Sequence, residues 1–178
     1  SAKLLMDAGM NVITLPKTID NDIYGTDTTF GFQSAVDIAT NVIDYIHSTA
    51  SSHGRIFVVE LMGRDAGWLT ASAALPAYLG GYGPDYVYLP EVPFSMNGFF
   101  QDLRRAMAKK PNVVVAVSEG IRFSDGKYVG EGTQSGSADV FGHKYLGGTG
   151  KALELAVKKE LGCKVRSVEL NLPQRCAA

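Results

Sequence analysis

The sequence predicts an α/β fold in which a mainly parallel sheet carries helices on both faces. Two observations lead to this prediction. Stretches with strand-like and helix-like patterns alternate along the 178 residues, as they do in chains built from strand–helix–strand units. The expected strands are also continuous apolar runs, such as residues 113–117 (VVVAV). Runs of this kind are typical of strands that are buried on both faces of a parallel sheet.

The first third of the chain contains one expected strand between two expected helices. Residues 1–9 resemble the last two turns of a helix that stops at Gly9. Residues 12–15 form a short apolar, β-branched run, and Pro16 would end it because proline has no N–H to donate to a neighbouring strand. From residue 29 to residue 48, apolar side chains recur every three or four positions, which predicts an amphipathic helix that ends in residues 51–54.

The alternation continues to the end of the chain. A glycine-rich stretch at residues 123–148 interrupts it, and we expect an excursion or hairpin there. Gly147 to Lys151 does not match the P-loop pattern, because Ala152 stands where Ser or Thr is needed. We therefore expect Thr149 to cap a helix. The remaining expected strands are residues 56–59, 86–89, 113–117 and 165–170, and the remaining expected helices are 67–79, 97–109 and 150–161.

Composition excludes several classes of function. The formal net charge is −1, with 46% hydrophobic and 20% charged residues, so there is no basic surplus that would favour nucleic acid as a partner. The longest apolar runs are too short to span a bilayer. Cys163 and Cys176 have neither metal-binding spacing nor a disulfide framework. We expect a cytoplasmic protein without a nucleic-acid or membrane partner.

A polar loop, Pro16-Lys17-Thr18-Ile19-Asp20-Asn21-Asp22, directly follows the first expected strand. Open α/β sheets bind their ligands at the carboxyl ends of strands. Asp20 and Asp22 would repel each other as like charges, which a metal ion, a lysine or a reacting proton would relieve. The ammonium group of Lys17 suits an anionic oxygen. These residues alone leave open whether the loop carries chemistry or whether its Asp and Asn side chains only form an Asx-turn.

Five motifs in order along the chain resemble the phosphofructokinase family. The resemblance covers nearly the whole chain and is weakest between residues 121 and 145. The motifs are the Pro16–Asp22 loop with Gly25-Thr26-Asp27-Thr28-Thr29-Phe30-Gly31-Phe32; Val58-Val59-Glu60-Leu61-Met62-Gly63-Arg64 with Asp65-Ala66-Gly67-Trp68; Pro90-Glu91-Val92-Pro93-Phe94; Val117-Ser118-Glu119-Gly120; and Arg166 with Gln174-Arg175.

The resemblance implies a partial phosphofructokinase-like, Rossmann-like fold and a division of the chain. Residues 1–30 would end a donor-side domain, residues 31–170 would form the domain that binds fructose 6-phosphate, and residues 171–178 would begin the return to the donor-side domain. The family's glycine-rich donor loop and its magnesium-binding aspartate would lie before Ser1. We therefore expect an internal fragment that is inactive alone, with Mg²⁺ as the cofactor of the whole enzyme.

The resemblance also implies a role for each site residue. Asp20 would be the base that takes the sugar hydroxyl proton, Asp22 would orient its loop, and Thr18 would contact the transferring phosphoryl group. Glu119 would accept hydrogen bonds from sugar hydroxyls. Arg64 would hold the sugar phosphate or the transition state, and Met62 and Gly63 would contact the substrate, with a place in the core as the equal alternative for Met62. Arg55, Arg166 and Arg175 would bind the terminal phosphate, with Arg55 and Arg166 reaching in from a neighbouring subunit of a homo-oligomer.

Lys17 bears on the phosphoryl donor. Many ATP-using members of the family have glycine at this loop position, whereas pyrophosphate-using members resemble this chain in having lysine. We therefore expect pyrophosphate as the donor, with ATP as the alternative. A further alternative is a non-catalytic regulatory subunit that binds sugar phosphate, against which the presence of Asp20, Asp22, Arg64 and Glu119 argues. The chain departs from the family at Leu172-Pro173, where relatives often have histidine or tyrosine.

Overall fold

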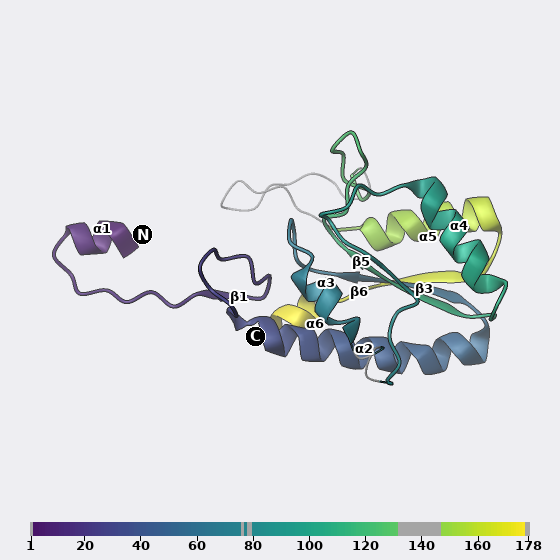
Figure 1. Ribbon diagram of the computed structural model, residues 1–178, viewed down its shortest axis with the longest axis horizontal. Coiled ribbons are helices and arrows are strands. Elements are labelled where there is room, and N and C mark those ends of the chain that lie inside the picture. The colour runs from purple at the N-terminus through teal and green to yellow at the C-terminus, as the bar shows by residue number, and fades with distance from the viewer. Residues whose placement is uncertain (1, 76, 78–79, 132–146, 177–178) are drawn as a thin grey trace.

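The computed structural model describes residues 2–75, 77, 80–131 and 147–176. Its main body is a four-stranded sheet flanked by helices, and its first residues extend away from that body (Figure 1). The strands are β3 (Ile56–Leu61), β4 (Tyr86–Tyr88), β5 (Val113–Ser118) and β6 (Val165–Glu169). They lie in the order β4-β5-β3-β6, and all three pairings are parallel. The predicted α/β fold with a parallel sheet is confirmed.

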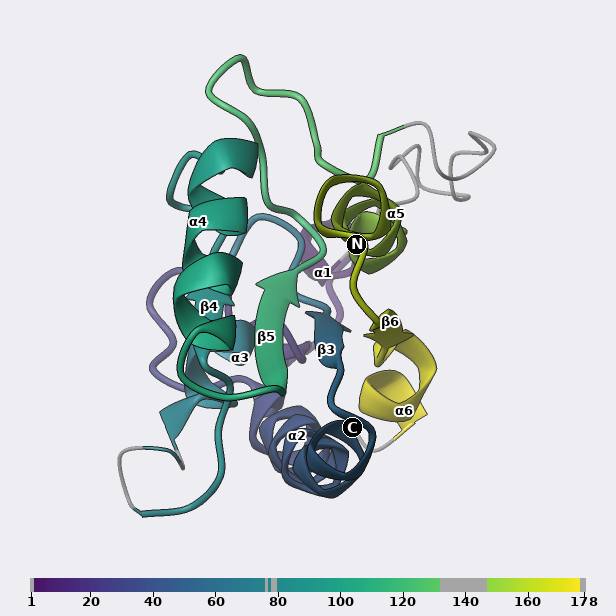
Figure 2. The same ribbon diagram turned by 90° about the vertical axis from the view of Figure 1, so that its right-hand side faces the viewer.

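Helices cover both faces of this sheet. Helices α4 (Met96–Met107) and α5 (Thr149–Leu161) lie on one face, and α2 (Phe32–His53) lies on the other (Figure 2). Alternate side chains of the central strands fill the two interfaces: Ile56 and Val58 belong to one core cluster, and Phe57 and Val59 to the other. Burial on both faces explains why the strands are apolar at successive positions rather than at alternate ones.

Helices α2, α4 and α5 lie near their expected positions, whereas two short helices differ from expectation. Helix α2 is longer than expected and ends at Gly54, which has φ +55° and donates its N–H to the carbonyls of Ala50 and Ser51. Helix α4 begins after Ser95, whose hydroxyl accepts the N–H of Gly98. Helix α3 covers only Trp68–Ser72, and the short α6 (Asn171–Cys176), which was not expected, packs beside α2.

The prediction of a strand at residues 12–15 is wrong. Helix α1 (Ala2–Asp7) does end near Gly9, but the following residues are extended chain without a strand partner among the described residues. Pairing begins later, where β1 (Lys17–Thr18) runs parallel to β2 (Phe30–Gly31). The side chains of Ile13 and Leu15 are 90% and 71% exposed. Apolar, β-branched composition favours a strand, but a strand also needs a neighbour to complete its hydrogen bonds.

Two further expectations concern the region before α5. Thr149 does not cap the helix: Gly148, with φ +77°, is the capping residue, and the Thr149 hydroxyl donates to the carbonyl of Glu119 at 2.9 Å. A hairpin is present at the start of the 123–148 segment, where Phe123 donates its N–H to the carbonyl of Lys127. Residues 132–146 lie outside the described part of the chain. Among the described residues, no helix has both the length and the apolar character that crossing a bilayer requires.

Candidate active site

The polar loop is held closed by Asn21, which has φ +55°. Its side-chain oxygen accepts the backbone N–H of Thr29 at 2.8 Å, and its side-chain nitrogen donates to the carbonyl of Asp27 at 3.3 Å. The Thr29 hydroxyl donates to the carbonyl of Thr18 at 2.7 Å. Inside the loop, the Thr18 hydroxyl accepts the N–H of Asp20 at 3.2 Å. These bonds fix the backbone around Asp20, and Asn21 was quoted in the motif without a role of its own.

A cavity of about 380 Å³ opens beside this loop. It brings together residues that are far apart in the sequence: the loop itself, the segment after β3, and α6. The residues that line it are Lys17, Thr18, Ile19, Asp20, Met62 and Arg175. Five of these six are residues for which the sequence predicted a role in the site.

Asp20 is the acid among the residues that line this cavity. Burial is the largest cause that raises the pKa of its carboxyl above the usual range, and the neighbouring charge of Asp22 raises it further. The positive charges of Arg64 and Arg175 act in the opposite direction. The Oδ1 atom of Asp20 is buried and has no hydrogen-bond partner among the described residues. A carboxylate with one uncommitted oxygen and two nearby guanidinium groups can accept a proton beside an anionic ligand.

A tight turn after β3 presents Arg64. Gly63 has φ +142° and Arg64 has φ +47°, and the N–H of Ala66 donates to the carbonyl of Gly63 at 2.7 Å. The Glu119 carboxylate accepts the backbone N–H of Arg64 at 3.1 Å. A Cβ atom on Gly120 would lie 1.6 Å from the carbonyl oxygen of Arg64, so only glycine fits there. The turn is therefore pressed against the end of β5.

Two other side chains hold the same segment, and sequence reasoning gave neither a role. The side-chain oxygen of Gln174 accepts the N–H of Met62 at 3.1 Å, and the carboxylate of Glu91 accepts the N–H of Gly67 at 2.6 Å. Both acceptors stand inside the quoted motifs. The motifs alone could have pointed to them, but not to their partners, which are 112 and 24 residues away.

Glu60 is a further residue to which sequence reasoning gave no role. It is 4% exposed in an otherwise apolar strand and accepts the N–H of Gly150, at the start of α5, at 2.7 Å. Burial raises the pKa of its carboxyl to about 7, even though the Gly150 bond opposes the shift. Burial likewise raises the pKa of Glu119, which is 8% exposed. The sequence did contain a signal for Glu60, because it is a single carboxylate within an apolar strand. Such a group is rarely buried without a partner.

Arg55 and Arg166 are not brought to this cavity. Arg55 directly precedes β3, and Arg166 pairs with Phe57 near the start of the same strand. Both lie at the amino edge of the sheet, where the strands begin. Asp20, Arg64 and Glu119 lie at the carboxyl edge, where β3 and β5 end. A six-residue strand is about 20 Å long, so one chain does not unite these two groups.

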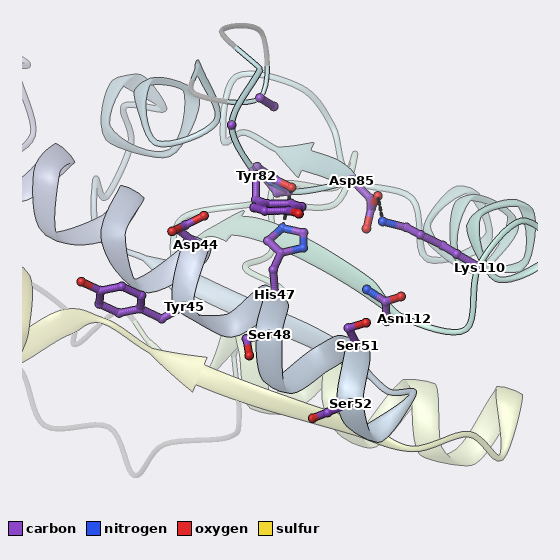
Figure 3. Close-up of a pocket in the computed structure, with 14 residues that line it drawn as sticks. Asp44, Tyr45, His47, Ser48, Ser51, Ser52, Tyr82, Asp85, Lys110 and Asn112 are labelled. Carbon is purple, nitrogen blue, oxygen red and sulfur yellow. Dashed lines mark hydrogen bonds and ion pairs between the residues drawn. The ribbon is translucent and has the colours of Figure 1, made fainter.

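A second and larger cavity, of about 1090 Å³, also lies toward the amino edge (Figure 3). The ring nitrogen Nε2 of His47 is 2.8 Å from the carbonyl of Gly83, and the His47 ring packs 5.4 Å from the ring of Tyr82. Lys110 forms an ion pair with Asp85 at 2.6 Å. None of the residues predicted for the site lines this cavity.

The described residues contain no group of three His, Cys, Asp or Glu side chains that could hold a metal ion between them. The polar loop carries two carboxylates, those of Asp20 and Asp22. Oxygen atoms of this kind suit Mg²⁺, which proteins commonly hold with one or two carboxylates together with substrate phosphates. The loop therefore fits the chemistry of such an ion as a partial set of ligands.

Comparison with curated proteins gives relatives with two named activities. The chain is 42% identical over 179 residues to an ATP-dependent 6-phosphofructokinase of Corynebacterium efficiens, covering 98% of this chain and 48% of that protein. It is also 42% identical over 174 residues to a pyrophosphate–fructose 6-phosphate 1-phosphotransferase of Amycolatopsis methanolica, covering 98% of this chain and 49% of that protein. The chain thus spans about half the length of these relatives.

Comparison with solved structures and with a family model also finds phosphofructokinases. The pyrophosphate-dependent phosphofructokinase of Nitrosospira multiformis matches with a TM-score of 0.77 and 26% identity, over 99% of this chain and 41% of that one. The phosphofructokinase family model matches residues 1–169. The motifs that lie around Asp20, Arg64 and Glu119 fall within this match. Because this family model matches nearly the whole sequence, the chain belongs to the phosphofructokinase family.

Proposed function

We propose that the protein containing this chain is a phosphotransferase of glycolysis that transfers a phosphoryl group to the 1-hydroxyl of fructose 6-phosphate and gives fructose 1,6-bisphosphate. The observation that carries the proposal is the Asp20 carboxylate, which has an uncommitted buried oxygen and lies within the electrostatic influence of Arg64 and Arg175. Phosphoryl transfer requires this combination, a base at the attacking hydroxyl and cations around the migrating group.

Each residue of the site then has a task. Asp20 accepts the proton of the sugar hydroxyl as the new O–P bond forms and the donor P–O bond breaks. Arg64 binds phosphate oxygens, since a planar guanidinium can form two parallel hydrogen bonds to them. Thr18 contacts the transferring group, and Asp22 keeps the pKa of Asp20 raised. The others are Arg175 and Met62 in the cavity wall, Gly63 in the Arg64 turn, and Glu119, which holds that turn through the Arg64 N–H and would accept a hydrogen bond from a sugar hydroxyl.

Mg²⁺, when bound, would neutralise charge on the donor phosphates, and Asp20 and Asp22 are the carboxylates of the polar loop that could help to hold it. We propose pyrophosphate as the donor, because Lys17 lines the cavity beside Asp20 and its ammonium can pair with a pyrophosphate oxygen. Orthophosphate is then the leaving group. ATP remains the alternative donor, and relatives of both kinds match this chain.

A donor-exchange assay tests the proposal on the full-length protein that contains this chain. Fructose 6-phosphate and Mg²⁺ are supplied with pyrophosphate or with ATP, and the reverse reaction is followed with orthophosphate. Reversible activity with pyrophosphate is the expected result. Activity with ATP alone would overturn the proposed donor and keep the acceptor. Lack of activity with both would favour the regulatory subunit that binds sugar phosphate.

Two variants sharpen this assay. Lys17→Gly should lower activity with pyrophosphate, and unchanged use of pyrophosphate would contradict the role given to Lys17. Asp20→Ser should lower kcat by about 10²- to 10⁴-fold, the usual contribution of general acid–base catalysis. Binding of fructose 6-phosphate, measured by calorimetry, should survive in Asp20→Ser because the phosphate-binding arginines are unchanged.

A further inference from the structure

The segment that carries Arg64 is held through its backbone by three side chains from three different parts of the fold. Gln174 of α6 accepts the N–H of Met62 at 3.1 Å, Glu119 after β5 accepts the N–H of Arg64 at 3.1 Å, and Glu91 after β4 accepts the N–H of Gly67 at 2.6 Å. Each of these N–H groups lies beyond the end of β3 and has no partner within the sheet. The shape of the segment therefore depends on side chains that are distant in the sequence.

Gln174 differs from the two glutamates because it is fully buried, at 0% exposure, and uncharged. Its backbone is fixed as well: its N–H donates to the carbonyl of Leu170 at 3.1 Å, and Leu170 donates to the carbonyl of Glu60 at 3.0 Å. The side-chain nitrogen of Gln174 has no partner among the described residues. The interaction that Gln174 supplies is therefore the one between its oxygen and Met62.

This bond joins two walls of the cavity. Met62 and Arg175 both line it, and Arg175 directly follows Gln174 in α6. Two residues after Met62, Arg64 acts on the Asp20 carboxyl from the same side of the sheet. When the Gln174–Met62 bond is formed, the positions of Arg64 and Arg175 relative to Asp20 are set together. Without it, the backbone bond from Leu170 to Glu60 still ties α6 to β3, but the side-chain link between α6 and the segment after β3 is lost.

We propose that Gln174 is a positioning residue for the acceptor site: it acts through the Met62 backbone to set the spacing between Arg64 and Arg175. This inference rests on the proposed function, because it assigns to that spacing the binding of the sugar phosphate. Gln174 itself does not line the cavity and is not placed in contact with substrate.

Gln174→Met tests the proposal in the full-length protein, since methionine has a similar volume and no acceptor oxygen. Leaving the buried Met62 N–H without a partner should raise KM for fructose 6-phosphate about tenfold, while KM for the phosphoryl donor stays within about twofold. A side chain that served only packing would lower the folded fraction, which reduces kcat and leaves both KM values unchanged. That result would overturn the proposal.

Gln174→Glu should restore the KM for fructose 6-phosphate, because an oxygen again faces the N–H of Met62 and the lost amide nitrogen had no described partner. The matched control is Thr70→Val, at a fully buried hydroxyl on α3 that also has no partner among the described residues. Thr70→Val should leave both KM values unchanged. An increase in the acceptor KM in Thr70→Val as large as that in Gln174→Met would show a general effect of core changes and overturn the proposal.

Amide hydrogen exchange supplies a readout that does not depend on activity. In Gln174→Met the N–H of Met62 should exchange faster, while the N–H of Gly67, held by Glu91, should exchange as before. If the unaltered protein lacks activity with both donors, the proposed function fails, yet exchange at Met62 still tests whether the Gln174 side chain holds the Met62 N–H. If activity is present and exchange at Met62 is unchanged in Gln174→Met, only the inference on Gln174 fails.

Discussion

Burial governs the acids around the site at the scale of single residues. Desolvation is the largest cause of the raised pKa of Asp20, of Glu60 and of Glu119. The three nevertheless have different partners. Glu60 accepts the N–H of Gly150 at the start of α5 and Glu119 accepts that of Arg64 in the turn after β3, whereas one oxygen of Asp20 accepts none. Two of the buried acids thus hold backbone groups in place, and the third keeps an oxygen that the proposed reaction would use.

The pH dependence of activity should report Asp20. The proposed mechanism requires the base form of Asp20, so kcat/KM should fall as the pH drops through its raised pKa. Asp22→Asn removes a negative charge that raises this pKa, and the acidic limb of the pH–rate profile should move to lower pH. Asp27→Asn, an exposed change in the segment that follows the polar loop, should leave the limb in place. An acidic limb that does not move in Asp22→Asn would mean that another group sets it.

The pH dependence of stability should report Glu60. Its ordinary pKa of 4.5 rises to about 7 on folding, so between these values the folded protein retains a proton that the unfolded chain has released. The free energy of unfolding therefore falls as the pH rises through this window, by about 1.4 kcal/mol per unit and by about 3 kcal/mol in all. Glu60→Gln cannot ionise and still offers an acceptor to Gly150, so this share of the fall should disappear.

Denaturant titrations between pH 4.5 and 7.5 measure the free energy of unfolding of Glu60→Gln and of the unaltered protein. The contributions of the other acids cancel in the difference between the two. Glu154→Gln is a control of opposite sign. Hydrogen bonds from Lys158 and Ser167 outweigh burial and hold the pKa of Glu154 down at about 2, so its contribution changes only at more acidic pH. Parallel stability curves for the unaltered protein and Glu60→Gln would show that Glu60 keeps an ordinary pKa.

At the scale of elements, the contact between the end of β5 and the Arg64 turn depends on Gly120. Gly120→Ala would place a Cβ 1.6 Å from the Arg64 carbonyl oxygen, and the turn must shift to admit it. We expect a loss of about 1–3 kcal/mol in the free energy of unfolding, the usual cost of overpacking. Because the turn carries Arg64, KM for fructose 6-phosphate should rise as well.

Gly98→Ala is the matched control. Gly98 lies in the first turn of α4, where an added Cβ would meet nothing nearer than Ser95 at 3.5 Å. Alanine there should raise the free energy of unfolding by about 0.5–1 kcal/mol, because glycine is the less favourable helical residue. Kinetic constants should not change in Gly98→Ala. Unchanged kinetics in Gly120→Ala would contradict the close packing described for the turn.

The sequence predicted elements well where the pattern is local. The helix from Phe32 and the strands from Ile56 and Val113 follow from side-chain spacing and from continuous apolar runs, because both faces of the sheet are covered. Residues 12–15 failed because composition does not supply a partner strand. The roles of Glu91 and Gln174 could not be derived, since the bonds they make join segments that only the finished fold brings together.

At the scale of the whole molecule, the residues predicted for the site lie at two edges of the sheet. Asp20, Arg64 and Glu119 are at the carboxyl edge, and Arg55 and Arg166 are at the amino edge. One chain cannot bring both groups to a single sugar phosphate across about 20 Å of strand. If both groups bind the same ligand, two copies of the chain must share each site, as the proposed homo-oligomer requires.

Subunit complementation should reveal this sharing. Asp20→Ser and Arg166→Ala should each inactivate the full-length enzyme. When the two variants are unfolded together and reassembled as dimers, half of the dimers are hybrids, and each hybrid has one intact site, so roughly a quarter of the unaltered activity should return. Asp20→Ser mixed with Arg64→Ala should recover none, because both residues serve the same site from the same chain. If hybrids form but regain no activity, Arg166 does not serve the site of the other subunit. The reason to propose an active site shared between two subunits then disappears.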